Sequence, residues 1–574
     1  MYANNPLVLE LIALLKAFGI KKVVISPGSR HRPLVASLEN DSYFELFSVV
    51  DERSAAFFAL GLIQECNEAV AITCSSGTAC INYGSAVIEA YYQRLPLLVI
   101  SSDRNPYFLN QGEDQMYAQS STFADFTKYH AQLPIINNEL DKWYANRLIN
   151  EGLIALRSHG KGPVHLNLPV DAHHGDSITV PVLPKVRKIT HNIYSRSLDW
   201  SGFVGRLKDK RVAVVWGQSV NSSERLLSAV NVFLSKTGGI LLTDKMSNCH
   251  SQYAITNTLL VLKTIKPSEY ESLMPDIVIS IGGNYIFNNE LKNFFRQGTI
   301  ENWRVGLEDK VCDPFRHLTE MFEMEEADFF EAVSENINSE AIEGYREQWL
   351  QFSDLPVPSL EQYNELYPIG KLLYALPENS DLQLANSNTI RFANYFPIKD
   401  SIRVNCNRGV NGIDGSMSTA VGFSSINDRP TFYITGELSF FYDMNALWIK
   451  HRSRQLRILL VNNNGGAVMY DLSSRPTDNK YPVYLATGHD AIAKGWAETQ
   501  GFKYIAAHNK AEVDEGIQQM VDLNQDTPIL LEVFTDYNDD GTAASEYFST
   551  LDRRTFSEKV QGKLSRVAHR ILKK

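Results

Sequence analysis

Long apolar runs and a leader-like start are both missing from the 574-residue sequence. No stretch of 18 or more residues is continuously apolar, and Met1 to Lys16 lacks the basic-then-apolar order of a secretory signal. Cysteine is also scarce: the six cysteines include no C-x-x-C spacing, which fits reduced thiols rather than disulfides or a zinc site. We therefore expect a cytoplasmic protein with no membrane span.

A net positive charge and nucleotide-binding motifs are lacking as well. The formal net charge is -11, which argues against a general nucleic-acid surface and leaves small anions to be bound by a few placed arginines. The stretch from 190 to 350 contains Gly282-Gly283 but neither a G-x-G-x-x-G nor a Walker pattern. We expect no nucleic-acid partner and no separate nucleotide site in the middle of the chain.

Short apolar, β-branched stretches alternate with stretches of helical periodicity, as at Lys22–Ile25 and Leu7–Phe18. This alternation indicates an α/β fold in which parallel sheets are covered by helices on both faces. The chain is too long for one core, so three domains of about 150 to 200 residues are expected. The expected segments are 1–185, 186–355, 356–552 and a basic amphipathic helix at 553–574, which either packs on the body or meets an anionic partner.

Oxygen-bearing side chains follow two successive predicted strands near the C-terminus. Gly436-Glu437-Leu438-Ser439 comes after the apolar stretch 430–435, and Asn462-Asn463-Asn464-Gly465-Gly466 comes after 457–461, with a helix predicted over 440–450. A carboxylate and an amide or carbonyl oxygen at adjacent strand ends favour Mg²⁺ or Ca²⁺ over zinc. The alternative is that Glu437 caps a helix and the asparagines only form turns.

Similar loops follow other predicted strands in both outer domains. Because the carboxyl ends of parallel strands lie on one edge of a sheet and bind ligands there, we expect these loops to line a common site. The loops are Ser26–Arg32, Asp51–Glu52, Ser75–Ala79, Ser102–Arg104, Asn386–Arg391 and Asn407–Gly415.

Taken in order, these loops and the two oxygen-bearing stretches resemble the thiamine diphosphate enzymes. The likeness is to the 2-succinyl-5-enolpyruvyl-6-hydroxy-3-cyclohexene-1-carboxylate synthase family of the menaquinone pathway. It covers the first and third expected domains. The resemblance implies three doubly wound parallel-sheet domains: a pyrimidine-binding domain, a central domain without cofactor, and a diphosphate- and metal-binding domain. It also implies a homodimer or homotetramer with the cofactor between the first domain of one subunit and the third of another.

The resemblance further implies a reaction and its residues. The reaction is decarboxylation of 2-oxoglutarate followed by addition to isochorismate, with thiamine diphosphate and Mg²⁺, or Mn²⁺ or Ca²⁺ in its place. The catalytic positions it implies are Glu52, which exchanges a proton with the pyrimidine ring, and Gln115. Substrate positions are Ser29, Arg30, Arg104, Ser387, Arg391 and Arg408; cofactor positions are Glu52, Gly412, Ile413, Gly436, Leu438, Ser439 and Val468; metal positions are Glu437, Asn463 and Gly465.

Three positions depart from the family pattern. Glu437 stands where the family usually has aspartate, and Asn289-Glu290 stands where it usually has a basic pair. His31-Arg32 replaces a small hydroxyl pair and is expected to add positive charge and bulk to the pocket.

These departures leave other functions open. The first alternative is a related decarboxylase or carboligase that acts on a different 2-oxo acid or acceptor. Weaker ones are a non-catalytic binding protein of the same fold, which would not need Glu52, and a flavin-bearing enzyme like acetolactate synthase.

Overall fold

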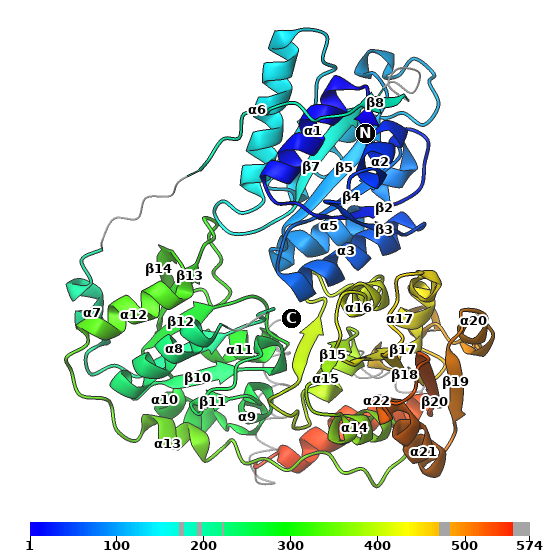
Figure 1. Cartoon of the computed structure of the whole chain (residues 1–574). Coiled ribbons are helices and arrows are strands. Elements are labelled where there is room, and N and C mark those ends of the chain that lie inside the picture. The colour runs from blue at the N-terminus through cyan, green and yellow to red at the C-terminus, as the bar shows by residue number, and fades with distance from the viewer. Residues whose placement is uncertain (171–176, 192–197, 221–222, 287, 470–482, 555–574) are drawn as a thin grey trace, which may run out of the picture.

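Three six-stranded parallel sheets, each flanked by helices, make up the computed structural model (Figure 1). The structure describes residues 1–554 apart from 171–176, 192–197, 221–222, 287 and 470–482. This confirms the predicted α/β class, while most of the predicted C-terminal helix at 553–574 lies outside the described residues. Within the described ranges, no helix is long and apolar enough to cross a membrane.

The N-terminal unit is a sheet with strand order β3-β2-β4-β5-β7-β6. Its strands are buried runs, and alternate residues feed two cores: Val70 and Ile72 face helices α3 and α5, whereas Ala71 and Leu98 face α1 and α6. Strands are β2 Lys22–Ile25, β3 Glu45–Ser48, β4 Val70–Cys74, β5 Leu97–Asp103, β6 Tyr129–Gln132 and β7 Val164–Pro169, with a small pair β1 Tyr2–Ala3 and β8 Ile178–Val180. Helices are α1 Pro6–Ala17, α2 Arg32–Glu39, α3 Glu52–Cys66, α4 Thr78–Ile81, α5 Gly84–Gln93 and α6 Glu139–Ala155.

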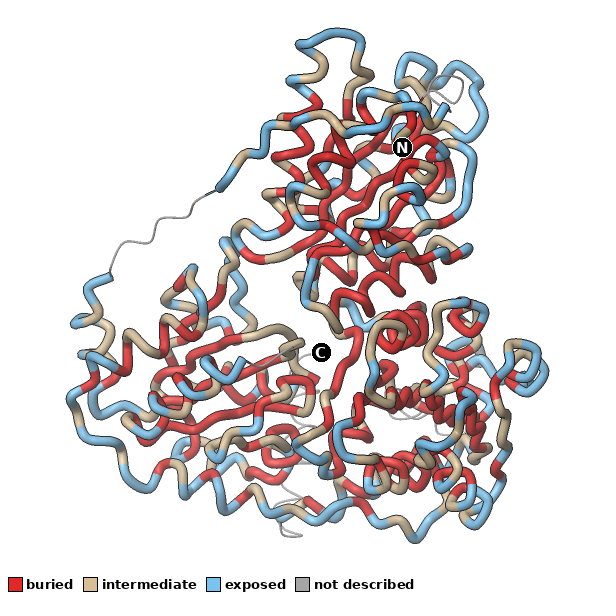
Figure 2. Tube along the Cα trace, in the orientation of Figure 1, coloured by how far each residue is buried: buried red, intermediate tan, exposed pale blue. Residues whose placement is uncertain are grey.

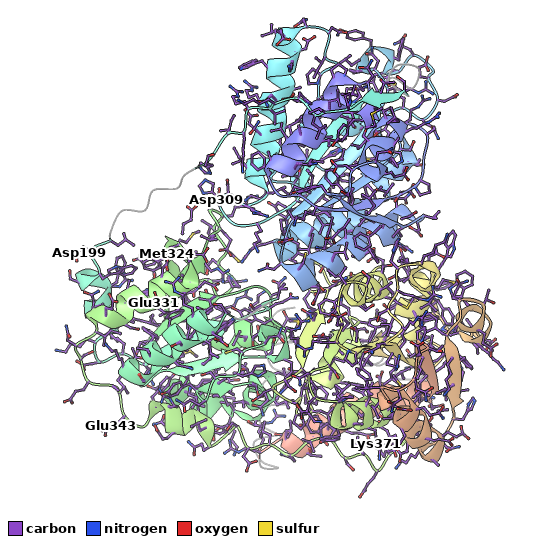
Figure 3. The ribbon with its side chains drawn as sticks, viewed as in Figure 1. Asp199, Asp309, Met324, Glu331, Glu343 and Lys371 are labelled. Atoms are coloured by element: carbon purple, nitrogen blue, oxygen red, sulfur yellow. The ribbon has the colours of Figure 1, made fainter. Side chains whose placement is uncertain are left out.

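The middle unit has strand order β11-β10-β9-β12-β13-β14. The Glu-rich stretch 320–347 holds the end of a strand, one whole helix and the start of another, and Glu331 and Glu343 lie on the outer side of the middle unit (Figure 3). Strands are β9 Val212–Trp216, β10 Ile240–Thr243, β11 Ala254–Ile255, β12 Ile277–Ile281, β13 Glu301–Gly306 and β14 Leu318–Glu323. Helices are α7 Ser201–Leu207, α8 Glu224–Thr237, α9 Thr258–Thr264, α10 Tyr270–Leu273, α11 Asn288–Phe295, α12 Glu326–Asn336 and α13 Tyr345–Leu350.

The C-terminal unit has strand order β16-β15-β17-β18-β20-β19. The helix predicted over 440–450 is wrong in its bounds: α17 begins at Glu437, directly after the strand, and ends at Tyr442, and a 3₁₀ turn over Met444–Trp448 follows. Strands are β15 Asp381–Leu384, β16 Arg403–Cys406, β17 Thr431–Gly436, β18 Leu456–Asn462, β19 Lys503–Ala507 and β20 Ile529–Phe534. Helices are α14 Leu366–Ala375, α15 Asn388–Ala393, α16 Ser416–Ser424, α17 Glu437–Tyr442, α19 Val483–Ala486, α20 Lys494–Thr499, α21 Lys510–Val521 and α22 Tyr537–Leu551.

The two outer sheets share one topology. In both, the strands lie in the chain order second, first, third, fourth, sixth, fifth, whereas the middle sheet runs third, second, first, fourth, fifth, sixth. In such sheets the connections change direction between the first and third strands, which opens a crevice at their carboxyl ends. The ligand-binding edge of each outer sheet is therefore set by the loops that follow its first and third strands.

Helices α3 and α16 each follow the second strand of an outer sheet, and they pack directly on one another. Both are buried along most of their length (Figure 2). Glycines make the close approach: a Cβ at Gly61 would collide with main-chain atoms of Thr419 and Phe423, and one at Gly422 would collide with the carbonyl group of Phe58. One apolar core consequently runs from the N-terminal unit into the C-terminal unit.

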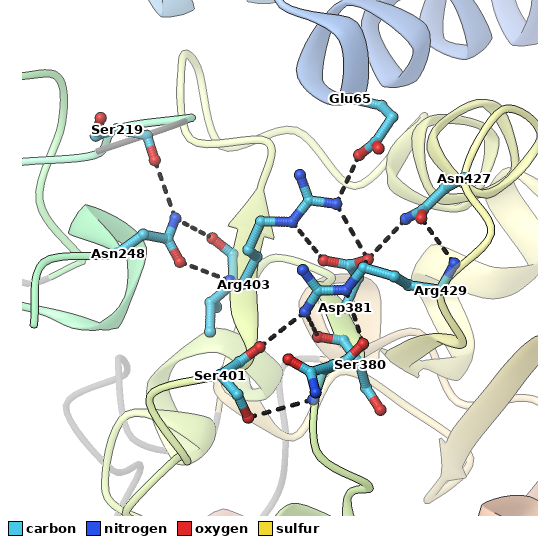
Figure 4. A network of polar contacts seen from close by, with 11 residues as sticks. Glu65, Ser219, Asn248, Ser380, Asp381, Ser401, Arg403, Asn427 and Arg429 are labelled. Carbon is cyan, nitrogen blue, oxygen red and sulfur yellow. Dashed lines mark hydrogen bonds and ion pairs between the residues drawn. The ribbon is translucent and has the colours of Figure 1, made fainter. Parts of the chain in front are cut away.

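A polar network joins the units at one end of α3 (Figure 4). Arg403 donates to the fully buried Asp381 at 2.6 Å and to Glu65 of α3 at 2.7 Å. Asn248 of the middle unit exchanges two hydrogen bonds with the main chain of Val404, at 2.7 and 3.0 Å. Strand β16 is thus in contact with all three units.

Candidate active site

Glu437 and Asn463 lie at the ends of neighbouring strands, as the sequence order predicts. Strands β17 and β18 pair in parallel up to Gly436 and Val461, so the two loops leave the sheet side by side. Both side chains are buried, and among the described residues Glu437 Oε1 and Asn463 Oδ1 have no hydrogen-bond partner. Buried oxygens are nearly always paired, so two unpaired ones at one place form a suitable donor set for a divalent cation.

Within the asparagine run, it is Asn462 that forms the turn which the alternative interpretation assigns to these residues. Asn462 Oδ1 accepts from the main-chain nitrogen of Asn464 at 3.1 Å, and its amide group donates to Glu532 at 2.8 Å. Asn463 instead donates through Nδ2 to Asp540 at 2.8 Å, and its oxygen has no partner among the described residues. The structure therefore favours a ligand role for Asn463.

Apart from Glu52, the remaining predicted cofactor and metal residues lie on the loops next to this pair. Ser439 Oγ donates to the carbonyl oxygen of Ile413 at 2.9 Å, and Asn386 Nδ2 donates to that of Gly412 at 2.7 Å. A Cβ on Gly466 would lie 3.4 Å from Leu438, which brings the glycine loop against α17. The predicted positions gathered here are Gly412, Ile413, Gly436, Leu438, Ser439 and the buried Gly465, and Val468 is half-buried just beyond them.

Arg408 lies where the middle unit meets the edge of the C-terminal sheet. Its guanidinium donates to Asn386 Oδ1 at 3.0 Å and to the carbonyl oxygen of Ile286 at 3.1 Å, while its buried Nε has no partner among the described residues. Ser387 precedes α15 with φ 73°, an unusual conformation for a residue with a side chain, and Arg391 follows within that helix. These three predicted substrate residues belong to one edge.

Other predicted substrate residues, and the predicted catalytic residue Gln115, line the edge of the N-terminal sheet. Arg30 donates its main-chain N–H to Ser75 Oγ at 3.4 Å, and its buried Nε lacks a partner among the described residues, whereas Ser29 is exposed. Gln115 has φ 54° and packs against the turn after β4, since a Cβ on Gly77 would lie 3.2 Å from it. Arg104 donates to the carbonyl oxygen of Asp114 at 2.8 Å and so joins the same loop.

Glu52 is the first residue of α3, and Asp51 caps that helix by accepting from Ser54 at 3.2 Å. Burial raises the pKa of Glu52, and the charge of Asp51 raises it further. A carboxyl group with a raised pKa is suited to hold and release a proton near neutral pH.

Two departures from the family pattern acquire a local explanation. Glu290 pairs with Lys263 at 3.0 Å, so its charge is balanced inside the middle unit. The expected extra charge at His31 is wrong: the side chain is 1% exposed, lies 3.3 Å from Thr73 Oγ1, and burial lowers its pKa to about 4. His31 is therefore a neutral, packed residue, and only the exposed Arg32 adds charge at this position.

Two residues near the Glu437–Asn463 pair were not predicted. His489 Nε2 lies 3.7 Å from Glu437 Oε1, and its Nδ1 accepts from the main-chain nitrogen of Ala491 at 3.1 Å, which assigns the proton to Nε2. Asp540 is 1% exposed and contacts Asn463 from behind. Both residues follow their partners by more than 50 positions and belong to no motif, so sequence alone held no signal for them.

Comparisons with known proteins found one matching family model and several similar proteins. The model of the thiamine pyrophosphate enzyme N-terminal TPP-binding domain matches residues 9–122. Proteins named 2-succinyl-5-enolpyruvyl-6-hydroxy-3-cyclohexene-1-carboxylate synthase from Bacteroides fragilis and Phocaeicola vulgatus are 38% and 37% identical to the chain. Each alignment covers 96% of this chain and all of the relative. A protein of the same name from Flavobacterium psychrophilum is 32% identical with the same coverage.

Proposed function

The chain belongs to the family of 2-succinyl-5-enolpyruvyl-6-hydroxy-3-cyclohexene-1-carboxylate synthases, and from that premise we propose a reaction. The enzyme decarboxylates 2-oxoglutarate and adds the remaining fragment to isochorismate in menaquinone biosynthesis, with thiamine diphosphate and Mg²⁺. When bound, thiamine diphosphate supplies the electron sink that decarboxylation requires. The observation that carries the proposal is the pair of buried, unpaired oxygens of Glu437 and Asn463 at adjacent strand ends.

We place the cation and the diphosphate group of the cofactor at the Glu437–Asn463 pair. Glu437, Asn463 and the main chain at Gly465 hold Mg²⁺, while Gly436, Leu438 and Ser439, with the 412–413 and 468 positions, hold the cofactor. Oxygen-only ligands suit Mg²⁺, and the longer Glu437 side chain in place of aspartate makes Mn²⁺ or Ca²⁺ acceptable substitutes.

Carboxylate recognition is the proposed task of the arginines. Both substrates carry carboxylates, which guanidinium groups bind with paired hydrogen bonds. The unpaired Nε groups of Arg30 and Arg408 are donors for such a ligand. The proposed substrate set is completed by Arg104, Arg391, Ser29 and Ser387, and Gln115 is the second proposed catalytic residue beside Glu52.

Glu52 is the proposed proton carrier for the pyrimidine ring of the cofactor, consistent with its raised pKa. Glu52→Gln should reduce turnover to background while cofactor affinity stays within a few-fold of wild type, measured by calorimetry. Glu39→Gln, at an exposed position at the end of α2, is the matched control and should keep turnover. Full activity of Glu52→Gln would remove Glu52 from the mechanism.

The direct test is incubation with 2-oxoglutarate, isochorismate and Mg²⁺, followed by mass detection of the adduct. Carbon dioxide release without the adduct would favour the alternative, a carboligase with another acceptor, and absence of both would favour another 2-oxo acid or a non-catalytic protein. A colourless preparation would exclude a flavin enzyme.

Assembly and location complete the proposal. We propose that the protein is cytoplasmic and forms a homodimer or homotetramer. Within each chain, the proposed domain boundaries are 185/186, 355/356 and 552/553. Apolar side chains in a loop and at helix ends of the two outer units support association: Val50, Tyr442 and Trp448 are 48%, 54% and 45% exposed. Light scattering on the purified protein gives the subunit number, and cell fractionation gives the compartment.

A further inference from the structure

Behind the Glu437–Asn463 pair lies a carboxylate that the proposed function does not use. Asp540, in the first turn of α22, is 1% exposed. Its Oδ2 accepts from Asn463 Nδ2 at 2.8 Å and from Thr535 Oγ1 at 2.5 Å, and its Oδ1 accepts from the main-chain nitrogen of Glu365 at 2.7 Å. Three donors from three different segments therefore fix this carboxylate.

This arrangement determines which end of the Asn463 amide faces Glu437. An asparagine amide can turn by half a circle with little change in shape, which exchanges its oxygen and its NH₂ group. With Asp540 behind it, the turned amide would place a carbonyl oxygen against a carboxylate and an NH₂ group where the cation binds. Both contacts would be unfavourable, because an acceptor would meet an acceptor and a donor would meet a cation.

The amide is buried, so water cannot relieve a wrong orientation. Asn463 is 5% exposed and Glu437 is 3% exposed, and no partner of Asn463 Oδ1 exists in the part of the chain that is described. Residues behind metal ligands often set the orientation of those ligands in this way.

We propose that Asp540 is a positioning residue that holds the Asn463 amide with its oxygen toward Glu437, so that the two oxygens form one divalent-cation site. The inference rests on the proposed function, which puts the cation at this pair. Asp540 itself contacts no cation and acts only through Asn463.

The test measures Mn²⁺ affinity by electron paramagnetic resonance in the presence of thiamine diphosphate. Asp540→Leu, of similar shape but without an acceptor, should weaken Mn²⁺ binding by about 10- to 100-fold, as is usual when the residue behind a metal ligand is lost. Asp540→Asn keeps one oxygen for Asn463 but turns an NH₂ group toward the main-chain nitrogen of Glu365, so its Mn²⁺ affinity should lie between those of wild type and Asp540→Leu. Asp539→Leu, at the neighbouring exposed position, is the control and should bind as wild type does.

The outcomes separate the two proposals. If the wild-type protein binds no Mn²⁺ with the cofactor, the proposed function loses its metal site. If the wild type binds and a folded Asp540→Leu binds within twofold of it, the positioning role is overturned. If circular dichroism shows that Asp540→Leu does not fold, Asp540→Ser replaces it, because a serine side chain is too short to reach Asn463. The expected loss of Mn²⁺ affinity is the same, and binding within twofold of wild type would again overturn the positioning role.

Discussion

Gly61 is the position where one methyl group should have the largest effect on the junction between α3 and α16. In a Gly61→Ala variant the new Cβ would lie 2.5 Å from the main-chain nitrogen of Phe423, and closer still to the carbonyl oxygen of Thr419. Ordinary van der Waals contact begins near 3.4 Å, so the helices must separate by about 1 Å. The atoms in the way are main chain, so no side-chain rotation relieves the clash.

The expected loss of stability is the difference between two terms. Overpacking a close-packed core costs about 1–3 kcal/mol, and a main-chain clash puts this site at the upper end. Alanine recovers about 1 kcal/mol because it favours the helix more than glycine does. The net loss of about 2 kcal/mol should lower the Tm by about 4–8 °C for a unit of 150–250 residues.

Scanning calorimetry of the whole chain measures this shift. Gly495→Ala is the control, because Gly495 is exposed in helix α20 and a Cβ there meets nothing within 4 Å. The control should be unchanged or more stable. If Gly61→Ala melts at the wild-type temperature or above, the close contact between α3 and α16 is not present in solution.

Two further predictions concern histidines. The pKa of His31 is about 4 in the folded protein and about 6.5 in the unfolded chain. Between these two values the unfolded chain binds a proton at His31 and the folded protein does not. The stability that neutral His31 contributes is therefore lost as the pH falls from about 6.5 toward 4. His31→Gln should therefore lose less stability than wild type between pH 7.5 and pH 5 in denaturant titrations; parallel losses would contradict this. His489→Phe keeps the ring contact with Phe441 but removes the buried Nε2–H, which has no hydrogen-bond partner among the described residues and is available to donate to the diphosphate of the proposed cofactor. It should weaken cofactor binding in calorimetry by about 1.5–3 kcal/mol, the usual range for a hydrogen bond to a charged group. His489→Gln should restore part of it, and equal affinity of all three proteins would exclude a role for this N–H.

The parts of the fold that depend on local pattern could be predicted from the sequence. Buried β-branched runs and helical periodicity gave the α/β class, and chain order alone put Glu437 and Asn463 at neighbouring strand ends because β17 and β18 are successive parallel strands. Strand order could not be predicted, because the pairing of β18 with β20 depends on contacts between segments far apart in the chain.

The same limit applies to individual side chains. His31 looks like an added charge in the sequence, and only its burial beside Thr73 shows that it is neutral. His489 and Asp540 reach the candidate site through the packing of distant segments, so no spacing in the sequence identifies them. The middle unit contributes in a similar way, since the carbonyl oxygen of Ile286 binds Arg408 without any motif.

Direct contact between the main chains of α3 and α16 also limits how the protein can move. Sliding motions between packed helices normally use a layer of side chains that changes rotamer, and at Gly61 and Gly422 that layer is missing. The N-terminal and C-terminal units of one chain should therefore move as a single rigid body. Any closure around a substrate must then come from the loops at the sheet edges or from displacement of the middle unit. The contact of the middle unit with Arg408 would link such a displacement to the proposed substrate site.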